Sequence, residues 1–269
     1  MRPTTAGSRS PRPCRSGERL RAWVDLQGAV NVRDLGGLPL IGGGVTAPGV
    51  LLRSDNLQDL SPGDVGQLVD ELGVRVVVDL RTGGEVELEG PGPLARDERV
   101  EIRHRSLYPE KGNLTDVLIG RDESESLAVQ YYLKYLADRP DSVVGALEDI
   151  ARGPGPVVVH CAAGKDRTGV VVAMALSAVG VERSAIIGDY VATEERIVEI
   201  MARLRSSPTY APDLAGVSDD SRKPRAEFME RVLDVLDERD GGPAGWLASH
   251  GFDPAALRAR LRDESQLLR

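Results

Sequence analysis

The sequence predicts an α/β fold in which a central, mostly parallel sheet of four to five strands is flanked by helices. Short β-branched runs bounded by Gly and Pro alternate with longer segments that suit helices. Two of these runs, residues 74–80 and 156–160, are apolar throughout most of their length, as in strands covered on both faces. Hydrophobic residues make up 41% of the chain but aromatic residues only 4%, so Val, Leu, Ile and Ala must supply most of the core.

The first predicted strand and helix lie between residues 50 and 73. Residues 50–54 suit a short strand. Ser61, Pro62 and Asp64 then stand in the order of an N-cap, a first helical residue and the acid of a capping box. We expect this helix to end at Gly73, where the chain can reverse easily.

The middle of the chain continues the alternation of strands and helices. Residues 74–80 predict a strand buried on both faces, whereas 100–107 alternate between apolar and polar and suit a strand nearer the sheet edge. Residues 127–136 and 143–150 have helical patterns. Residues 156–160 follow a Gly-Pro-Gly sequence and predict another buried strand.

The last third of the chain is predicted to be helical. Residues 169–179 follow a tight loop and form an apolar segment long enough for a helix against the sheet. Residues 183–269 suit more polar helices, interrupted by a segment rich in Pro, Ser and Asp at 206–224. We therefore expect one domain over residues 21–269, with these helices covering one of its faces.

Residues 1–20 carry Pro, Ser, Gly and Arg with almost no apolar side chains and predict a disordered tail. They lack the apolar stretch of about 7–15 residues that a Sec signal needs. A twin-Arg signal is missing too, and no run approaches the roughly 18 apolar residues of a membrane span. We expect a cytoplasmic protein without an integral membrane segment, and export without a Sec signal remains open.

The charge and the cysteine count exclude several classes of protein. A formal net charge of -8 argues against a protein that coats nucleic acid. The 2 cysteines, Cys14 and Cys161, provide neither a disulfide framework nor a metal-ligand spacing. We therefore expect no metal and no cofactor, and an anionic ligand must be captured locally. The sequence leaves the oligomeric state open.

The strongest functional signal is the segment from His160 to Gly169, in which Cys161 and Arg167 are separated by five residues between a strand and a helix. This spacing lets the backbone close into a cradle whose N–H groups point inward at the positive end of a helix. Arg167 can then hold two phosphoryl oxygens as a bidentate fork. The substrate-binding loop is predicted to consist of His160, Ala162, Ala163, Gly164, Lys165 and Thr168 around the nucleophile.

The same surroundings should activate Cys161. Amide dipoles, a helix N-terminus and a guanidinium stabilise a thiolate, so we expect an ionised nucleophile at neutral pH. Thr168 is placed to donate a hydrogen bond to the sulfur, and His160 is expected to order the loop. A Walker A cradle is excluded because Val159 and Asp166 stand where its first Gly and its Ser or Thr belong. A non-catalytic phosphate-binding module, a sulfurtransferase and an arsenate reductase are the weaker alternatives.

A phosphate ester also needs a proton for its leaving oxygen, and the sequence offers more than one donor. Asp166 lies within the cradle, although it also suits a structural anion at a helix N-terminus. Asp79 ends a buried strand, where α/β folds collect ligands, although an ion pair with Arg81 is its alternative role. An acid between residues 110 and 123 is the third candidate. Arg33, Asp34, Arg53 and Arg81 suit either a shell around the cradle or structural salt bridges.

The loop is similar to that of bacterial phosphatases of the protein tyrosine phosphatase superfamily that carry His-Cys-x-x-Gly-Lys-Asp-Arg-Thr-Gly, which residues 160–169 match throughout. Residues 31–37, 52–54, 79–81 with Glu85, and 188–190 also match, so the resemblance extends from about residue 26 to the C-terminus. It implies a cysteine phosphatase fold and a metal-independent protein-tyrosine phosphatase.

The resemblance further implies phosphorylated proteins or phosphoinositides as substrates, with phosphoserine and phosphothreonine hydrolysed beside phosphotyrosine. Lys165 matters for this breadth, because relatives that act on lipid phosphates tend to carry a loop Lys that meets a neighbouring phosphate; a solvated loop Lys is the alternative. The resemblance also implies a helical lid, which we place at about residues 194–240.

Overall fold

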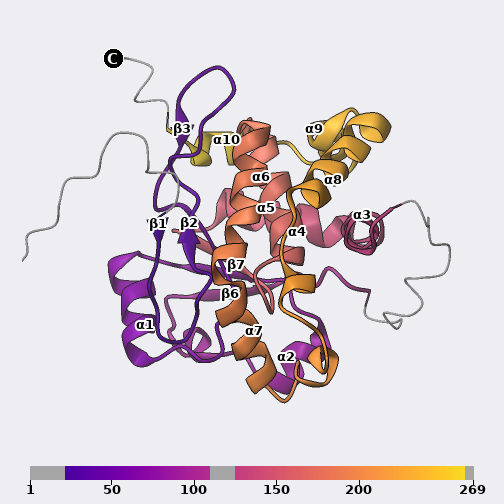
Figure 1. The fold of residues 1–269 in the computed structure, drawn as a ribbon. Helices are drawn as coiled ribbons and strands as arrows, with labels where there is room; N and C mark the ends of the chain where they lie inside the picture. The colour runs from indigo at the N-terminus through magenta and orange to yellow at the C-terminus, as the bar shows by residue number, and fades with distance from the viewer. Residues whose placement is uncertain (1–21, 110–124, 264–269) are drawn as a thin grey trace, which may run out of the picture.

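The computed structural model describes residues 22–109 and 125–263. The predicted tail and the third group of candidate acids, at residues 110–123, lie outside these ranges. The strands are β1 Ala22–Trp23, β2 Arg33–Asp34, β3 Val45–Thr46, β4 Leu51–Ser54, β5 Val76–Asp79, β6 Glu101–His104, β7 Val157–His160 and β8 Arg262–Asp263. The helices are α1 Pro62–Gly66, α2 Gly83–Glu89, α3 Leu127–Asp138, α4 Pro140–Arg152, α5 Asp166–Val179, α6 Arg183–Ala192, α7 Ile197–Ser206, α8 Ala226–Asp240, α9 Gly242–Ser249 and α10 Ala255–Leu261 (Figure 1).

The central sheet has the strand order β1-β2-β4-β7-β5-β6. Its four longer strands, β4, β7, β5 and β6, run parallel to one another. Beyond β4, β2 pairs antiparallel with β4, and β1 pairs antiparallel with β2. The prediction of a mostly parallel sheet is therefore confirmed, and β6 lies at the edge as its alternating pattern indicated. The sequence did not reveal β1 and β2, because two residues are too few to show a period.

The sheet separates two apolar layers, because successive residues of a strand point to opposite faces. On one face Leu51, Val76, Val78, Val157 and Val159 pack into a large core with residues of α3–α6 and α8–α10. On the other face Leu52, Val77 and Val158 pack with residues from around α1. Figure 1 shows α8, α9 and α10 gathered at one end of the molecule, and α2 and α7 at the other.

The register of the parallel strands brings their carboxyl ends to one edge. His160 is paired with Ser54 on one side and with Asp79 on the other, and Asp79 is paired in turn with His104. The chain that follows β7 therefore emerges between the ends of two neighbouring strands, which is where ligands bind in open α/β sheets.

Two predicted helices differ from the structure in their ends. The capping box before α1 is present, since the N–H of Asp64 donates to Ser61 Oγ and the N–H of Ser61 donates to Asp64 Oδ2. After α1 the helical backbone continues as a π-helical turn, Gln67–Glu71, and so ends close to the predicted Gly73. The helix predicted to begin at residue 169 already begins at Asp166, because the end of the Cys161 loop forms its first turn.

The region predicted as helices broken at 206–224 is also close to the structure. After α7 the chain has only short 3-10 turns, Pro212–Leu214 and Asp220–Arg222, before α8. Residues of α7 form a small apolar core with Tyr210 and Leu214, and this core includes Ala162 of the Cys161 loop. No helix in the described ranges is long and apolar enough to cross a membrane.

Candidate active site

The Cys161 loop joins β7 to α5. Cys161 follows the last residue of the strand and is 2% exposed. Gly164 has a φ of +64°, and a Cβ there would lie 2.3 Å from the backbone oxygen of Ser54. Only glycine meets both conditions, because it adopts positive φ readily and carries no Cβ. The loop is thereby folded tightly against the end of β4.

The amides of the loop face inward because its carbonyls are held from outside. Three carbonyl oxygens of the loop accept hydrogen bonds. Ala162 O accepts from Asn56 N–H at 2.9 Å, Ala163 O from Asn31 Nδ2 at 3.0 Å, and Gly164 O from Arg53 Nη2 at 2.5 Å. In a trans peptide the C=O and the following N–H point in opposite directions. The N–H groups of Ala163, Gly164 and Lys165 therefore point into the concave side, which agrees with the predicted anion cradle.

A buried charge network supports these donors. Asp189 of α6 accepts from Arg33 Nε at 2.8 Å and from Arg53 Nη1 at 2.5 Å. Asn31 Oδ1 accepts from Arg33 Nη1 at 2.5 Å. Burial raises the pKa of Asp189, but Arg33 and Arg53 outweigh it and keep the carboxyl ionised. The network therefore fixes Asn31 and Arg53 in the positions from which they hold the loop.

The four residues considered for a shell around the cradle thus divide into two pairs. Arg33 and Arg53 belong to the network behind the loop. Asp34 instead accepts from the N–H groups of Gly36 and Gly49, and Arg81 pairs with Asp79. Arg33, Arg53 and Arg81 thus form the structural salt bridges that the sequence left open as the alternative, whereas Asp34 binds backbone N–H groups instead.

Arg167 is held by Glu85 of α2. Its Nη1 and Nη2 donate to the two oxygens of Glu85 at 2.6 and 2.9 Å, and its guanidinium carbon lies 5.5 Å from the centre of the Tyr108 ring. Burial raises the pKa of Glu85, but Arg167 outweighs this effect and lowers the pKa to about 2. Glu85 and the charge of Cys161 raise the pKa of Arg167 well above its usual value, despite its burial. A permanent cation is thereby fixed close to Cys161.

The position of Glu85 follows from a local signal. Thr82 and Glu85 form a capping box, in which Glu85 Oε2 accepts from Thr82 N–H at 2.7 Å and Thr82 Oγ1 accepts from Glu85 N–H at 3.1 Å. In the sequence, Glu85 stands out only as part of a segment that matches the phosphatases. The spacing of Thr82 and Glu85 after a buried strand indicates the cap, but nothing in it points to Arg167.

Asp166 lies at the beginning of α5 with its side chain 35% exposed. Its Oδ1 accepts from Lys165 Nζ at 2.6 Å and from the hydroxyl of Tyr132 on α3. Burial raises the pKa of Asp166, but Lys165, Tyr132 and Arg167 together lower it by more. The pKa of Asp166 therefore lies below its usual value. The loop Lys is therefore paired with this carboxylate, and Tyr132 is a contact that the sequence did not suggest.

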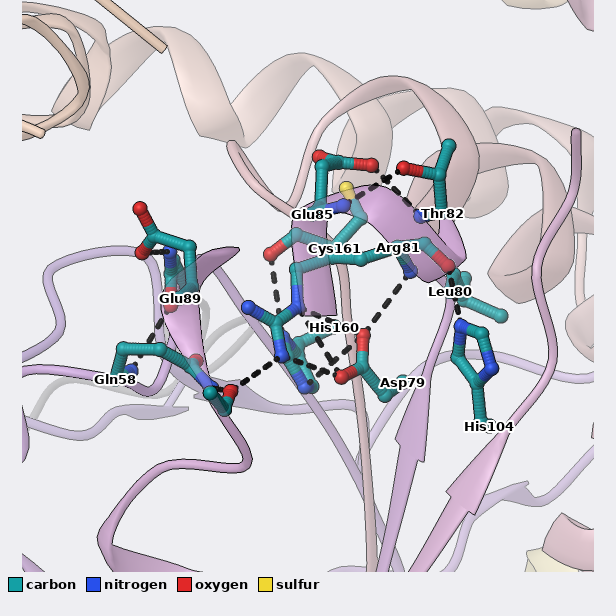
Figure 2. A network of polar contacts seen from close by, with 12 residues as sticks. Gln58, Asp79, Leu80, Arg81, Thr82, Glu85, Glu89, His104, His160 and Cys161 are labelled. Carbon is teal, nitrogen blue, oxygen red and sulfur yellow. Dashed lines mark hydrogen bonds and ion pairs between the residues drawn. The ribbon is translucent and has the colours of Figure 1, made fainter. Parts of the chain in front are cut away.

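Asp79 lies in a closed environment. Its carboxylate accepts from Arg81 Nε and Nη2 at 3.0 and 2.6 Å, and His160 Nε2 lies 3.6 Å from Asp79 Oδ1 (Figure 2). Burial raises the pKa of Asp79, but His160 and Arg81 together hold it well below its usual range. The side chain is 4% exposed and is absent from the lining of the large cavity described below. This is the ion pair left open as its alternative role, so the geometry argues against Asp79 as the proton donor.

His160 and Thr168 lie beneath the loop. Burial lowers the pKa of His160 although Asp79 opposes the shift, and His160 Nδ1 lies 3.2 Å from the Cys161 carbonyl, where the ring can order the loop. The hydroxyl of Thr168 is buried and has no hydrogen-bond partner among the described residues. The hydrogen bond expected between Thr168 and the Cys161 sulfur is therefore not formed in this structure.

A cavity of about 1310 Å³ opens in front of Arg167. Lys165, Asp166, Arg167 and Glu85 line it, together with an aromatic group of Tyr108, Tyr131, Tyr132, Tyr135, Tyr210 and Phe228. Within the described ranges, no group of three or more His, Cys, Asp or Glu side chains is arranged to hold a metal ion. The cavity therefore joins a charged end, where Glu85, Lys165, Asp166 and Arg167 lie, to walls that suit an aromatic or other partly apolar group.

Comparison with known proteins places this site in a family context. The model of the "Tyrosine phosphatase family" matches residues 24–264. The triple specificity protein phosphatase PtpB of Mycobacterium tuberculosis is 28% identical, over 88% of this chain and 97% of that protein. A tyrosine-protein phosphatase of Nostoc commune is 30% identical, over 72% of this chain and 70% of its own length. The crystal structure of P. aeruginosa TpbA is similar with a TM-score of 0.33 and 16% identity, covering 80% of this chain and 98% of that one.

Proposed function

Because the chain belongs to the tyrosine phosphatase family and is a phosphatase, we propose that it hydrolyses phosphate monoesters through a phosphocysteine intermediate on Cys161. One observation supports this most directly. A buried cysteine at the end of β7 begins a loop whose carbonyls are held by other elements, and the residues at the end of this loop, Lys165, Asp166 and the guanidinium of Arg167 fixed by Glu85, line a large cavity. These are the groups that a thiolate nucleophile and a phosphoryl group require.

In the first step the Cys161 thiolate attacks phosphorus. The S–P bond forms, the P–O bond to the leaving group breaks, and Asp166 gives its proton to the departing oxygen. In the second step water attacks phosphorus and gives a proton to the Asp166 carboxylate. The S–P bond then breaks, which releases orthophosphate and restores the thiolate. The unpartnered Thr168 hydroxyl is the group we assign to stabilise the sulfur as it leaves.

We assign the proton donor to Asp166 because it lines the cavity, whereas Asp79 is enclosed by Arg81 and His160. The lowered pKa of Asp166 belongs to the free protein. A bound phosphate dianion raises the pKa of a nearby carboxyl, because like charges disfavour its ionised form. Substrate binding therefore favours the protonated form of Asp166, which can then give its proton to the leaving oxygen.

Asp166→Asn is expected to lower kcat toward phenyl phosphate by about 10²–10³-fold, the usual contribution of a general acid. Activity that needs a protonated acid falls as the pH rises through the pKa of that acid, so the variant should lose the basic limb of its pH–rate profile.

Asp79→Asn should keep that limb and instead lose about 3–5 kcal/mol of stability, because Arg81 is left without its buried partner. Urea unfolding and pH–rate profiles of both variants provide the measurements.

The assignment is wrong if Asp166→Asn keeps the basic limb. If Asp79→Asn loses the limb and Asp166→Asn keeps it, the roles are reversed. If neither variant loses it, the donor lies elsewhere, and residues 110–123 become the place to look.

We also propose that the mechanism is independent of metal ions, because the thiolate supplies the nucleophile and Arg167 with the loop amides supplies the charge that binds phosphate. Hydrolysis of p-nitrophenyl phosphate should therefore be unchanged by an excess of EDTA. A loss of activity that added Mg²⁺ or Zn²⁺ restores would contradict this proposal.

The proposed substrates are phosphotyrosine, phosphoserine and phosphothreonine in proteins, and phosphoinositides. The aromatic walls and the size of the cavity support a bulky group beyond the phosphate. Lys165 lies at the same end as Arg167, where it can meet a second phosphate when it leaves Asp166. The name of the mycobacterial relative states triple specificity for that protein. Initial rates on a phosphotyrosine peptide, a phosphoserine peptide and a phosphoinositide compare these substrates directly.

We further propose that residues 194–240 act as a lid over the site within a single domain of residues 21–269. Tyr210, Arg222 and Lys223 of this region line the cavity, and α7 packs against the Cys161 loop through Ala162. Arg203 of α7 also donates to Asp55 and to the carbonyl oxygen of Asn56, so the region is anchored at its α7 end.

A further inference from the structure

The two oxygens of Asp166 have different surroundings. Oδ1 accepts from Lys165 Nζ and from the Tyr132 hydroxyl. Among the described residues, no hydrogen bond is formed by Oδ2, although the side chain lines the cavity and is 35% exposed. One oxygen therefore anchors the carboxyl group, and the other is available to the cavity.

Tyr132 is rigidly placed. It is 1% exposed on α3, and its ring contacts that of Tyr190 edge-to-face with the centroids 6.1 Å apart. Tyr190, from α6, is also 1% exposed. Gly169 makes room for it, because a Cβ at residue 169 would lie 2.9 Å from the Tyr190 ring. Three helices, α3, α5 and α6, thus fix the geometry of this contact.

The direction of the hydrogen bonds follows from the number of available protons. An ionised carboxylate only accepts, and each tyrosine hydroxyl has one proton to donate. Tyr132 gives its proton to Asp166 Oδ1, so in the contact of 2.8 Å between the two hydroxyls Tyr190 must be the donor. Burial and the Asp166 charge raise the pKa of both tyrosines, which keeps them protonated as this arrangement requires.

We propose that Tyr132, supported by Tyr190, is a positioning residue that holds Asp166 through Oδ1, so that Oδ2 carries the proton to the leaving oxygen. This inference rests on the proposed role of Asp166 as general acid. Lys165 alone cannot replace the tyrosine, because it is a point charge on a flexible stem, whereas the buried phenol fixes a direction.

Loss of the Tyr132 hydroxyl should change the pH dependence of the reaction. A hydrogen bond to the charged form of a carboxyl stabilises that form, so removing the Tyr132 hydroxyl should raise the pKa of Asp166. The basic limb, along which activity is lost as Asp166 loses its proton, should then move to higher pH. Removing the Tyr132 hydroxyl leaves the other charged and titratable groups around Asp166 unchanged. These are Lys165 and Arg167, which lower its pKa, and Tyr108, Tyr135 and Tyr190, whose own pKa values its charge raises.

A second consequence concerns the leaving group. Phenol, with a pKa of about 10 like the tyrosine side chain, depends strongly on protonation as it leaves, whereas the more acidic p-nitrophenol depends on it weakly. A displaced general acid should therefore slow the hydrolysis of phenyl phosphate more than that of p-nitrophenyl phosphate. A purely structural defect would slow both equally.

The test compares Tyr132→Phe and Tyr190→Phe with the matched control Tyr135→Phe. Tyr135 lies one turn further along α3, is buried, and bonds Tyr108 rather than Asp166. Tyr132→Phe is expected to lower kcat for phenyl phosphate about tenfold, the equivalent of one hydrogen bond to a charged group. It should also shift the basic limb upward. Tyr190→Phe should act in the same direction but less, and Tyr135→Phe should leave the limb in place.

The double variant Tyr132→Phe/Tyr190→Phe removes both hydroxyls and leaves neither without a partner, so it replaces Tyr132→Phe if the single variant does not fold. An unshifted limb together with an equal loss on both substrates would overturn the inference. The shift can be separated from the proposed function, because Asp166→Asn tests the general acid itself. If Asp166→Asn removes the limb and the tyrosine variants do not move it, only the positioning role fails.

Discussion

Cys161→Ser is expected to lower kcat by about 10⁴-fold or more, the scale on which loss of a catalytic nucleophile is measured in other enzymes. A serine hydroxyl stays protonated at neutral pH and so cannot replace the thiolate on which the proposed first step depends. The variant should nevertheless fold normally, because it changes a single side-chain atom and the carbonyls of the loop are held by Asn31, Arg53 and Asn56. Steady-state rates on p-nitrophenyl phosphate measure the loss.

Binding should survive this substitution. The donors that hold phosphate are backbone amides and Arg167, and Glu85 fixes Arg167 without help from the sulfur. Titration calorimetry with tungstate should give similar affinities for the wild-type chain and the serine variant. A folded variant that loses both turnover and anion binding would show that the sulfur, rather than the cradle, holds the ligand.

The covalent intermediate provides an independent measurement. Rapid denaturation of the wild-type chain during turnover of a ³²P-labelled ester should leave label on the protein, and Cys161→Ser should retain none. Label on the serine variant would place the phosphoryl group on another residue.

The place of the Cys161 loop between a strand and a helix could be predicted from sequence because the signal is local. Ten consecutive residues contain the cysteine, the small residues and the arginine of the motif, and strand and helix patterns border them. The two buried strands, β5 and β7, could also be predicted, because an unbroken β-branched run is typical of a strand covered on both faces.

The supports of the loop could not be predicted, because their partners are distant in the chain. Arg33 and Asp189 are separated by 156 residues, and Arg167 and Glu85 by 82. Single residues of this kind carry no periodic signal, and either could have been a surface charge. Asp79 illustrates the same limit, since its place at a strand end was visible but its enclosure by Arg81 and His160 was not.

The second large effect is expected at Arg167. Its guanidinium has five N–H donors, of which one on Nη1 and one on Nη2 point to Glu85. The remaining hydrogens on Nε and Nη2 form a second fork, at the other edge of the plane. Arg167 can therefore bind Glu85 and two phosphoryl oxygens at the same time. Its pairing with Glu85 fixes the orientation of the guanidinium plane.

Arg167→Lys keeps the charge but has a single nitrogen, which cannot form both forks. We expect kcat/KM toward p-nitrophenyl phosphate to fall by about 10²–10³-fold, comparable to the loss of a transition-state donor in other enzymes. Glu85→Gln is the matched variant, because it retains the size and one acceptor of Glu85 but removes its charge. Its expected loss is about tenfold, because the guanidinium stays in the site and loses only its orientation. If Arg167→Lys were no worse than Glu85→Gln, charge alone would suffice, and the bidentate geometry would have no role in binding the phosphoryl group.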